Sequence, residues 1–225
     1  MTLATSLVTL KEVKKNPLVD VYIHKANDHL GAMGYTEHGH RHANLVSSIA
    51  HNVLTRLGYS EREAELAAIA GYLHDIGNVV SRVNHAQIGA VLAGRIVADM
   101  GMETAELAAI LGAIGNHEED QGDPVSTISA AVILADKTDV HRTRVRNTDL
   151  ATFDIHDRVS YAAVYSFLKV EPEVRAVTLE ITIETEICPV MEYFEIFLTR
   201  MIMCRRAAEL LDARFGLLIN GAKLL

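Results

Sequence analysis

Six histidine and aspartate residues are distinctive in this chain because each lies on, or next to, an otherwise apolar helical row. They are His42, His74, Asp75, His85, His117 and Asp136. Imidazole nitrogens and carboxylate oxygens are common ligands of divalent metals in proteins. An unpaired charge at a buried position would cost roughly several kcal/mol, and one metal centre would satisfy all of these groups together. The pattern therefore predicts a metal centre.

A single polar residue in an apolar row is more often a hydrogen-bonded core residue than a ligand. Here the same arrangement recurs on five separate helical segments. For example, His42 begins a row with Val46 and Val53, and His74 follows small residues such as Gly71 that let neighbouring helices approach closely. Five coincidences of this kind favour one common site over unrelated core residues.

Most segments that carry these residues have the apolar spacing of helices. Helices are predicted over about residues 16–31, 84–99 and 103–118. A further helix is predicted to end at Gly58, and the next is predicted to begin with the capping box of Ser60 and Glu63. The last helix of this part is predicted to begin near Ser126. The C-terminal quarter differs, because apolar and polar residues alternate over residues 177–183 as in a half-buried strand. Pro189 is expected to begin a long helix, and the tail from Phe215 to form a second short strand that could pair antiparallel with the first.

These elements predict a mainly α fold. We expect a helical bundle over residues 1–170 and, over residues 171–225, an appendage of two strands and one long helix that packs on the same core. The segment from about Val174 onward is expected to be structural or oligomeric and not catalytic. Apolar positions left exposed on its long helix would favour a homodimer.

Composition excludes several classes of function. The net charge of −8 argues against a nucleic-acid partner held by bulk electrostatics. The only cysteines, Cys188 and Cys204, provide no disulfide framework and are expected to be reduced core thiols. The first 15 residues lack the apolar segment of a secretory signal, and no run of residues is long and apolar enough to span a membrane. We therefore expect a cytoplasmic protein without a membrane partner.

The pattern His42…His74-Asp75…Asp136 resembles the HD superfamily of metal-dependent phosphohydrolases, which is named after the His-Asp pair. The strings "RHANLVSSIA", "YLHDIGN" and "ILADKTD" around these residues fit that family, and the resemblance covers roughly residues 20–146. It implies an HD-domain helical bundle in which these four residues bind one metal. It also implies a catalytic role for Asp75.

The segments around His85 and His117 resemble the subgroup with two metals, which includes HD-GYP phosphodiesterases and HD-fold diiron oxygenases. This resemblance implies that Asp75 bridges to a second metal held by these two histidines. The Gly-Tyr-Pro signature is absent, however, and Asn78 and Asn116 replace a lysine and a histidine of the HD-GYP pattern. These departures argue against cyclic di-GMP as the substrate.

Imidazole-rich ligation favours manganese, iron, nickel or zinc, and magnesium is a further possible ion. We expect a one- or two-metal centre, with two ions preferred. Lys137, Arg142 and Arg146 follow the last ligand closely and could form a cationic rim for a small phosphate substrate, the alternative being a solvated helix end. His38, four residues before His42, is a further candidate for the substrate side of the site.

Two further features lie near the predicted ligands in the sequence. The acidic loop that includes Glu118 and Glu119 is expected to be a lid or surface loop and not a source of ligands. Asp139 is a candidate for holding a ligand histidine from outside the ligand set.

The leading hypothesis is a metal-dependent phosphohydrolase, either a phosphomonoesterase or a phosphodiesterase, that acts on a nucleotide or another small phosphorylated metabolite. One alternative is an HD-fold oxygenase in which a diiron pair at the same ligands activates dioxygen, resembling myo-inositol oxygenase. Another is a non-catalytic metal-binding or signalling domain. The six proposed ligands alone do not separate these functions.

Overall fold

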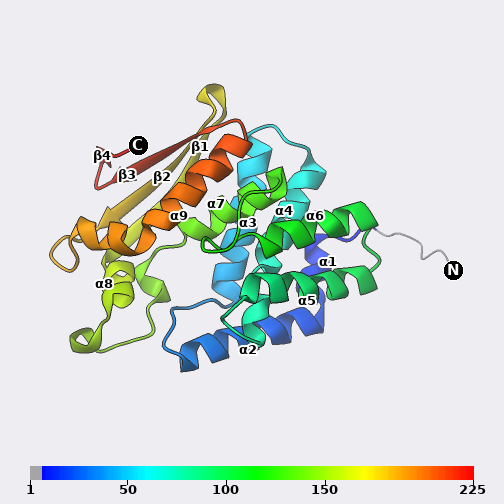
Figure 1. Ribbon diagram of the computed structural model, residues 1–225, viewed down its shortest axis with the longest axis horizontal. Helices are drawn as coiled ribbons and strands as arrows, with labels where there is room; N and C mark the ends of the chain where they lie inside the picture. Colours follow the sequence, from blue (N-terminus) through cyan, green and yellow to red (C-terminus); the bar gives the residue numbers. More distant parts are fainter. Residues whose placement is uncertain (1–6) are drawn as a thin grey trace.

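The computed structural model describes residues 7–225, so the first six residues of the segment examined for a secretory signal lie outside the described residues. The fold is mainly helical, with a small sheet at the C-terminal side (Figure 1). The N-terminal helices are α1 (Leu10–Lys15), α2 (Pro17–Ala32), α3 (His40–Arg56), α4 (Glu61–Leu73), α5 (His85–Asp99), α6 (Thr104–Gly115) and α7 (Thr127–Thr138). A short 3-10 helix, η1 (Ile76–Val79), connects α4 to α5.

The helix starts follow from capping chemistry in the sequence. The side chain of Asn16 accepts a hydrogen bond from the Leu18 N–H, and Pro17 occupies the first turn of α2. Ser60 and Glu63 form the expected capping box at the start of α4. The order of the elements confirms the predicted mainly α fold with a C-terminal appendage.

The C-terminal part contains η2 (Arg142–Arg144), η3 (Leu150–Thr152), α8 (Ile155–Ala162), β1 (Ala163–Glu171), η4 (Pro172–Val174), β2 (Ala176–Ile183), α9 (Val190–Leu210), β3 (Arg214–Ile219) and β4 (Ala222–Lys223). The described chain thus has four strands, in the order β1-β2-β3-β4, whereas the sequence predicted two. The first strand, β1, was missed because its outward residues include Tyr165 and Phe167, which hide the alternation of polar and apolar residues.

The expected antiparallel pairing of the tail is wrong. Strand β3 runs parallel to β2, with Val177 opposite Phe215. Helix α9 joins the two strands, and a helix of this length returns the chain to the same end of the sheet, as parallel neighbours require. The antiparallel neighbour of β2 is β1.

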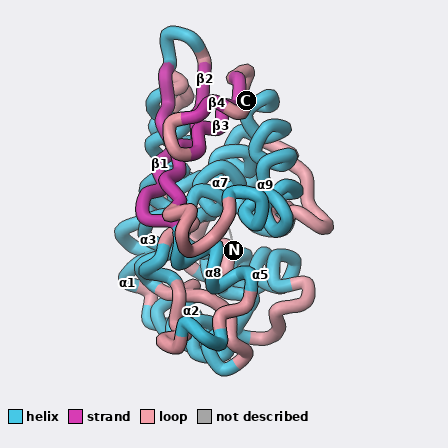
Figure 2. Tube along the Cα trace, turned by 90° about the vertical axis from the view of Figure 1, so that its left-hand side faces the viewer, coloured by secondary structure: helices cyan, strands magenta, loops and turns pink. Residues whose placement is uncertain are grey.

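The appendage and the helical bundle share one apolar core. Helix α9 lies between the sheet and α7, and β1 lies beside α3 (Figures 1 and 2). Ile133 and Leu134 of α7 belong to the same buried cluster as Phe197 and Met201 of α9. Because α7 contributes Asp136 near its end, α9 packs directly behind a residue of the candidate centre.

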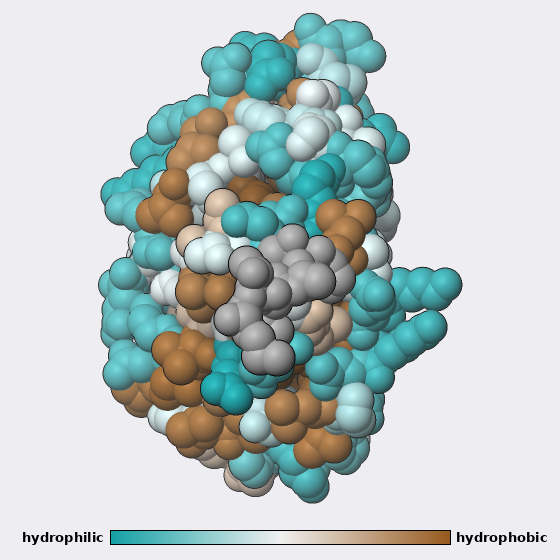
Figure 3. All heavy atoms as spheres, turned by 90° about the vertical axis from the view of Figure 1, so that its right-hand side faces the viewer, coloured by the Kyte–Doolittle hydropathy of each residue, from teal (hydrophilic) through white to brown (hydrophobic). Residues whose placement is uncertain are grey.

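Two surface properties complete the fold. Within the described residues, no helix combines the length and apolar character required to cross a lipid bilayer. The face at the right of Figure 1 is a mosaic of hydrophilic and hydrophobic residues (Figure 3), as is usual for a protein surface exposed to water.

Candidate metal centre

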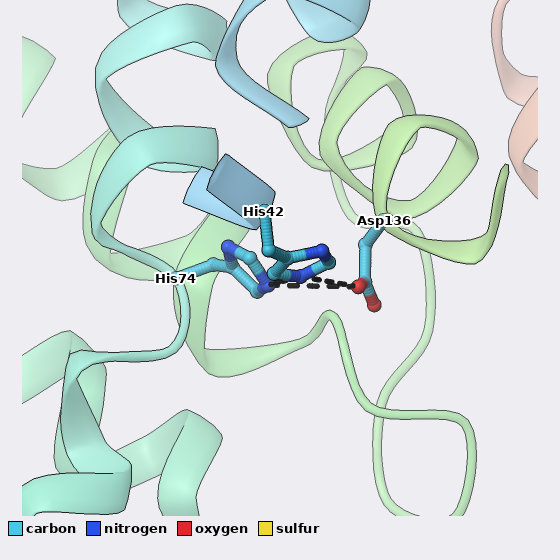
Figure 4. A group of neighbouring side chains, drawn as sticks. All are labelled: His42, His74 and Asp136. Atoms are coloured by element: carbon cyan, nitrogen blue, oxygen red, sulfur yellow. Dashed lines mark hydrogen bonds and ion pairs between the residues drawn. The ribbon is translucent and has the colours of Figure 1, made fainter. Parts of the chain in front are cut away.

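Three helices bring the first cluster of candidate ligands together. His42 lies in the first turn of α3, His74 directly follows α4, and Asp136 lies in the last turn of α7. Their side chains point toward one another (Figure 4). The Nε2 atoms of His42 and His74 are 3.2 Å apart, and Asp136 Oδ1 is 3.3 Å and 3.5 Å from them. Both rings are buried.

The close approach of α4 to α3 depends on Gly71. A β-carbon at this position would lie 3.2 Å from a Val46 side-chain carbon and 3.3 Å from the Ser47 backbone. A larger residue would push α4 away from α3. The small residue therefore helps to place His74 opposite His42.

A second cluster adjoins the first. His85 is the first residue of α5, and His117 follows the end of α6. Their Nε2 atoms are also 3.2 Å apart, and Glu118 Oε2 lies 3.2 Å from that of His85. The sequence predicted a helix that extends to about residue 118, but α6 ends at Gly115. His117 therefore lies in the loop that follows α6.

Asp75 lies between the two clusters. Its Oδ2 is 3.4 Å from His74 Nε2 and 3.7 Å from that of His42, whereas its Oδ1 is 3.4 Å from His85 Nε2 and 3.9 Å from that of His117. Asn78 donates a side-chain hydrogen bond to Asp75 Oδ1 at 2.9 Å and so fixes the carboxylate. Each carboxylate oxygen thus faces one cluster, an arrangement that suits a bridging ligand.

Hydrogen bonds on the far side of the rings show which nitrogens are free to bind a cation. The Nδ1 of His42 lies 2.7 Å from Asp139 Oδ2, and the Nδ1 of His74 lies 2.8 Å from the Gly71 carbonyl. Since oxygens without a proton only accept, each Nδ1 must donate, and each neutral ring then directs an Nε2 lone pair at the other. Two lone pairs 3.2 Å apart require a proton or a metal between them.

The charges around the first cluster suit a cation. Burial would raise the pKa of Asp136, but Lys137 and hydrogen bonds with His42 and His74 hold it well below its usual range. Burial would lower the pKa of His74, but the charges of Asp75 and Asp136 raise it to about 9. Without a metal, His74 therefore holds a proton in the place of the cation.

The second cluster lacks such a proton. Burial and the neighbouring charges of His74 and His85 lower the pKa of His117 to about 3. Its Nδ1 donates to the Ile114 carbonyl at 2.7 Å, so its Nε2 carries the lone pair. The Nη1 of Arg82 lies 3.1 Å from His85 Nε2 and supplies positive charge at this cluster.

The donor set fits divalent metals. Groups that could each hold an ion are His42, His74 and Asp136; His74, Asp75 and His117; and His85, His117 and Glu118. The nitrogen spacing of 3.2 Å in both histidine pairs is compatible with one shared metal at the usual distance of about 2.0–2.1 Å from each nitrogen. Mixed imidazole and carboxylate ligation suits manganese, iron, nickel or zinc.

A pocket lined by charged residues of both signs lies next to both clusters, although none of the cluster residues lines it. It has a volume of about 400 Å³, and its wall includes His38, three arginines and three aspartates, namely Arg82, Arg144, Arg200, Asp139, Asp154 and Asp157. The His38 ring centroid is 5.4 Å from that of His42, and Arg82 contacts His85. The pocket is therefore adjacent to the first cluster through His38 and to the second through Arg82.

Two arginines of this wall, Arg144 and Arg200, differ in their partners. Arg144 is buried and donates to the backbone carbonyls of Glu37 and Asp139, so its role is to hold the loop. Arg200 of α9 bonds Glu119 Oε1 at 2.7 Å through its Nε, which leaves its Nη groups free to donate. A residue of the C-terminal segment therefore reaches the pocket, which the sequence did not predict.

The expected cationic rim needs correction. Helix α7 ends at Thr138, so Arg142 and Arg146 do not share a helical face. Arg142 pairs with Glu184 at 2.7 Å, Arg146 bonds Asn27, and neither lines the pocket beside the clusters. The sequence could not show this because the position at which α7 ends depends on tertiary packing.

Lys137 also differs from its expected role. It is buried, and its Nζ lies 2.9 Å from Asp136 Oδ2 and 2.5 Å from Glu119 Oε2. Its charge is therefore paired with two carboxylates of the protein. In this position Lys137 orients Asp136 and links it, through Glu119, to Arg200 on α9.

Glu118 and Glu119 lie closer to the candidate centre than the sequence predicted. Glu118 lies among the possible ligands of the second cluster, and burial raises the pKa of its carboxyl. Glu119 is held by Lys137 and Arg200. The only signal in the sequence is their position, because Glu118 follows His117 directly and Glu119 is the next residue.

Comparison with known proteins bears on the family of this chain. A family model described as HD domain matches residues 37–141, which include every residue of the two clusters. An uncharacterized protein of Methanocaldococcus jannaschii is 30% identical over 199 residues, which cover 78% of this chain and 76% of that protein.

Proposed function

Since this chain belongs to the HD domain family, which generally comprises metal-dependent phosphohydrolases, we propose that it hydrolyses a phosphate ester of a nucleotide or small metabolite. The observation that carries the proposal is the pair of histidine clusters that share the carboxylate of Asp75, next to a pocket of about 400 Å³ whose lining includes Arg82 and Arg200. The volume of this pocket is in the range of small-molecule sites and suits a mononucleotide or a sugar phosphate.

The proposed ligands are His42, His74, Asp75 and Asp136 for one ion and His85, His117 and Asp75, with Glu118, for a second ion. Bound divalent metals would polarise a phosphoryl oxygen and lower the pKa of a water molecule. The division of the Asp75 oxygens between the clusters supports its role as the shared ligand. Asp139 and the Gly71 carbonyl orient the imidazoles of His42 and His74.

The remaining pocket residues would bind and orient the substrate. Arg82 and Arg200 offer guanidinium groups to the phosphate from opposite parts of the chain. Burial and the charge of Arg144 hold the pKa of His38 well below its ordinary value, so this ring is neutral. Its Nδ1 donates to the Thr36 carbonyl at 2.7 Å, which leaves Nε2 able to accept a proton or hydrogen bond.

The test uses the full chain after treatment with a chelator. With added Mn²⁺, we expect turnover of p-nitrophenyl phosphate or bis(p-nitrophenyl) phosphate, and the more active of the two identifies a monoesterase or a diesterase. Asp136→Asn should abolish turnover, whereas Asp99→Asn, at an exposed residue of α5 paired with Arg95, should leave it unchanged. Full metal occupancy without turnover of any ester in a wider phosphate panel would contradict the proposal.

The same protein preparation distinguishes the hydrolase from the two alternative functions. If the iron-loaded protein consumed dioxygen with a substrate while no ester was cleaved, the oxygenase would replace the hydrolase. Metal binding without either reaction would favour a signalling domain.

A further inference from the structure

A second cavity, of about 520 Å³, lies between α3, the end of α7 and β1. We call it the α3–β1 cavity, and Figure 2 shows the two elements side by side. Its lining includes the apolar side chains of Leu45, Ile49 and Val53 from α3 and of Leu168 and Val170 from β1. Apolar residues of a helix and of an edge strand therefore form an open hollow.

Apart from Phe167, the rest of this lining is polar and includes several basic side chains. Arg41, Arg56, His141 and Lys169 contribute to it, and the only carboxylate in the lining is that of Asp139. That carboxylate is already bonded to Arg41 and His42. Lys169 pairs with the partly exposed carboxylate of Glu171 at 2.9 Å. Arg41 is held by Glu37 as well as by Asp139, so Arg56 is the one Lys or Arg side chain of this lining for which the described residues provide no ion pair. An anion in the cavity would therefore pair with Arg56 and compete with carboxylates of the protein for Lys169 and Arg41.

We propose that the α3–β1 cavity is a second ligand site, which binds a small amphiphilic anion. The occupant would place a carboxylate or phosphate head among Arg41, Arg56 and Lys169 and an apolar body against the aliphatic residues of α3 and β1. The volume lies within the usual range of about 300–1,000 Å³ for small-molecule sites. This inference does not require the proposed hydrolysis, because it concerns binding in the cavity, which shares Asp139 alone with the lining of the pocket beside the metal centre.

One residue connects the cavity to the metal centre. The Nη2 of Arg41 lies 2.8 Å from Asp139 Oδ2, and the same oxygen accepts the Nδ1–H of His42 at 2.7 Å. An anion that draws Arg41 toward the cavity would leave more negative charge on Asp139. The hydrogen bond to His42 would then strengthen and make its Nε2 a better metal ligand. Occupancy of the cavity should therefore tighten metal binding.

Binding is tested with decanoate as the anion and decanol as its uncharged counterpart, by calorimetric titration of the full chain. We expect saturable binding of one decanoate per chain, with decanol weaker by roughly tenfold because it lacks the pairs with the three cations. Equal binding of the two probes, or the absence of saturable decanoate binding, would overturn the proposal.

Substitutions assign the binding to the cavity. Arg56→Gln and Lys169→Gln should each weaken decanoate binding roughly twofold to fivefold, as expected for partly exposed ion pairs. Arg95→Gln, which removes the same charge from an exposed position on α5, is the matched control and should change nothing. If Arg56→Gln and Lys169→Gln also changed nothing, decanoate would be bound elsewhere, for example beside the metal centre.

The connection is tested separately by measuring Mn²⁺ affinity with and without saturating decanoate. We expect an increase of roughly fivefold, and the same factor for decanoate affinity when Mn²⁺ is present, because linkage is reciprocal. The effect should disappear in Arg41→Gln. An unchanged Mn²⁺ affinity would overturn the connection through Arg41.

Discussion

The backbone of Gly77 lies directly against the backbone of His85. A β-carbon on Gly77 would lie 1.9 Å from the His85 carbonyl oxygen and 2.5 Å from the amide nitrogen of Gly89. Since these are backbone atoms, they cannot move aside as a flexible side chain would. The glycine that follows the His-Asp pair thus allows η1 to pack on α5, and this packing places His85 against Asp75.

Gly77→Ala should therefore damage both the fold and the second cluster. Overpacking costs roughly 1–3 kcal/mol or more, and here α5 must shift away from η1. Gly112→Ala is the control, because a β-carbon there meets only Val125 at 3.7 Å and lies inside α6, where alanine is favoured by about 0.5–1 kcal/mol. Chemical denaturation of both variants measures the difference. Equal stability of the two would show that η1 and α5 are not tightly packed.

Asp75→Ala should lose most of the bound metal. It removes the carboxylate whose two oxygens face both clusters, so neither ion would keep its full ligand set. Metal analysis of protein purified without chelator provides the measurement. Asp99→Ala removes an exposed carboxylate from α5 and should keep the metal. Full occupancy in Asp75→Ala would refute the bridging role.

Replacement of both His85 and His117 by alanine should reduce the stoichiometry from about two metals to about one. These rings belong to the second cluster, whereas His42, His74 and Asp136 remain in place for the first ion. Circular dichroism would check that the helices survive. If the stoichiometry did not change, His85 and His117 would be core histidines held by the carbonyls of Arg82 and Ile114.

Local signals in the sequence predicted the helices well. The N-cap Asn16 and the capping box at Ser60 act within a few residues, so their effect can be derived without tertiary information. The sequence also predicted that the six histidine and aspartate residues would gather, because buried polar groups need partners.

Features that depend on distant parts of the chain could not be predicted. The length of α7 decides that Arg142 turns toward Glu184, and the packing of α9 decides that Arg200 reaches the pocket. Strand β1 was hidden because Phe167 faces outward although it is apolar. In each case a tertiary contact overrides the local pattern.

Metal affinity should rise with pH. In the metal-free protein the pKa of His74 is raised to about 9, so this ring is protonated at neutral pH. A metal binds only the neutral imidazole, and binding must release that proton. Between pH 6.5 and 8.5 the affinity for Mn²⁺ should therefore increase roughly tenfold per pH unit, and it should level off above the pKa. Calorimetry in buffers of different ionisation enthalpy counts the released protons. A pH-independent affinity over this range would contradict the protonated state of His74.

The last prediction concerns the contribution of the C-terminal helix to substrate binding. Arg200 on α9 lines the pocket beside the metal centre and is oriented by Glu119. In the proposed reaction, Arg200→Gln removes a charge-assisted hydrogen bond to phosphate and should lower kcat/KM roughly tenfold to hundredfold, mainly through KM. Arg206→Gln is the matched control, because Arg206 lies on the same helix and pairs with Asp123 of the same loop but does not line the pocket. Metal content should stay the same in both variants, which separates loss of substrate binding from loss of the centre. If Arg200→Gln lowered the metal content instead, the role of Arg200 would be to hold Glu119 and Lys137 behind Asp136. If kcat/KM stayed unchanged, α9 would be structural, as the sequence alone suggested.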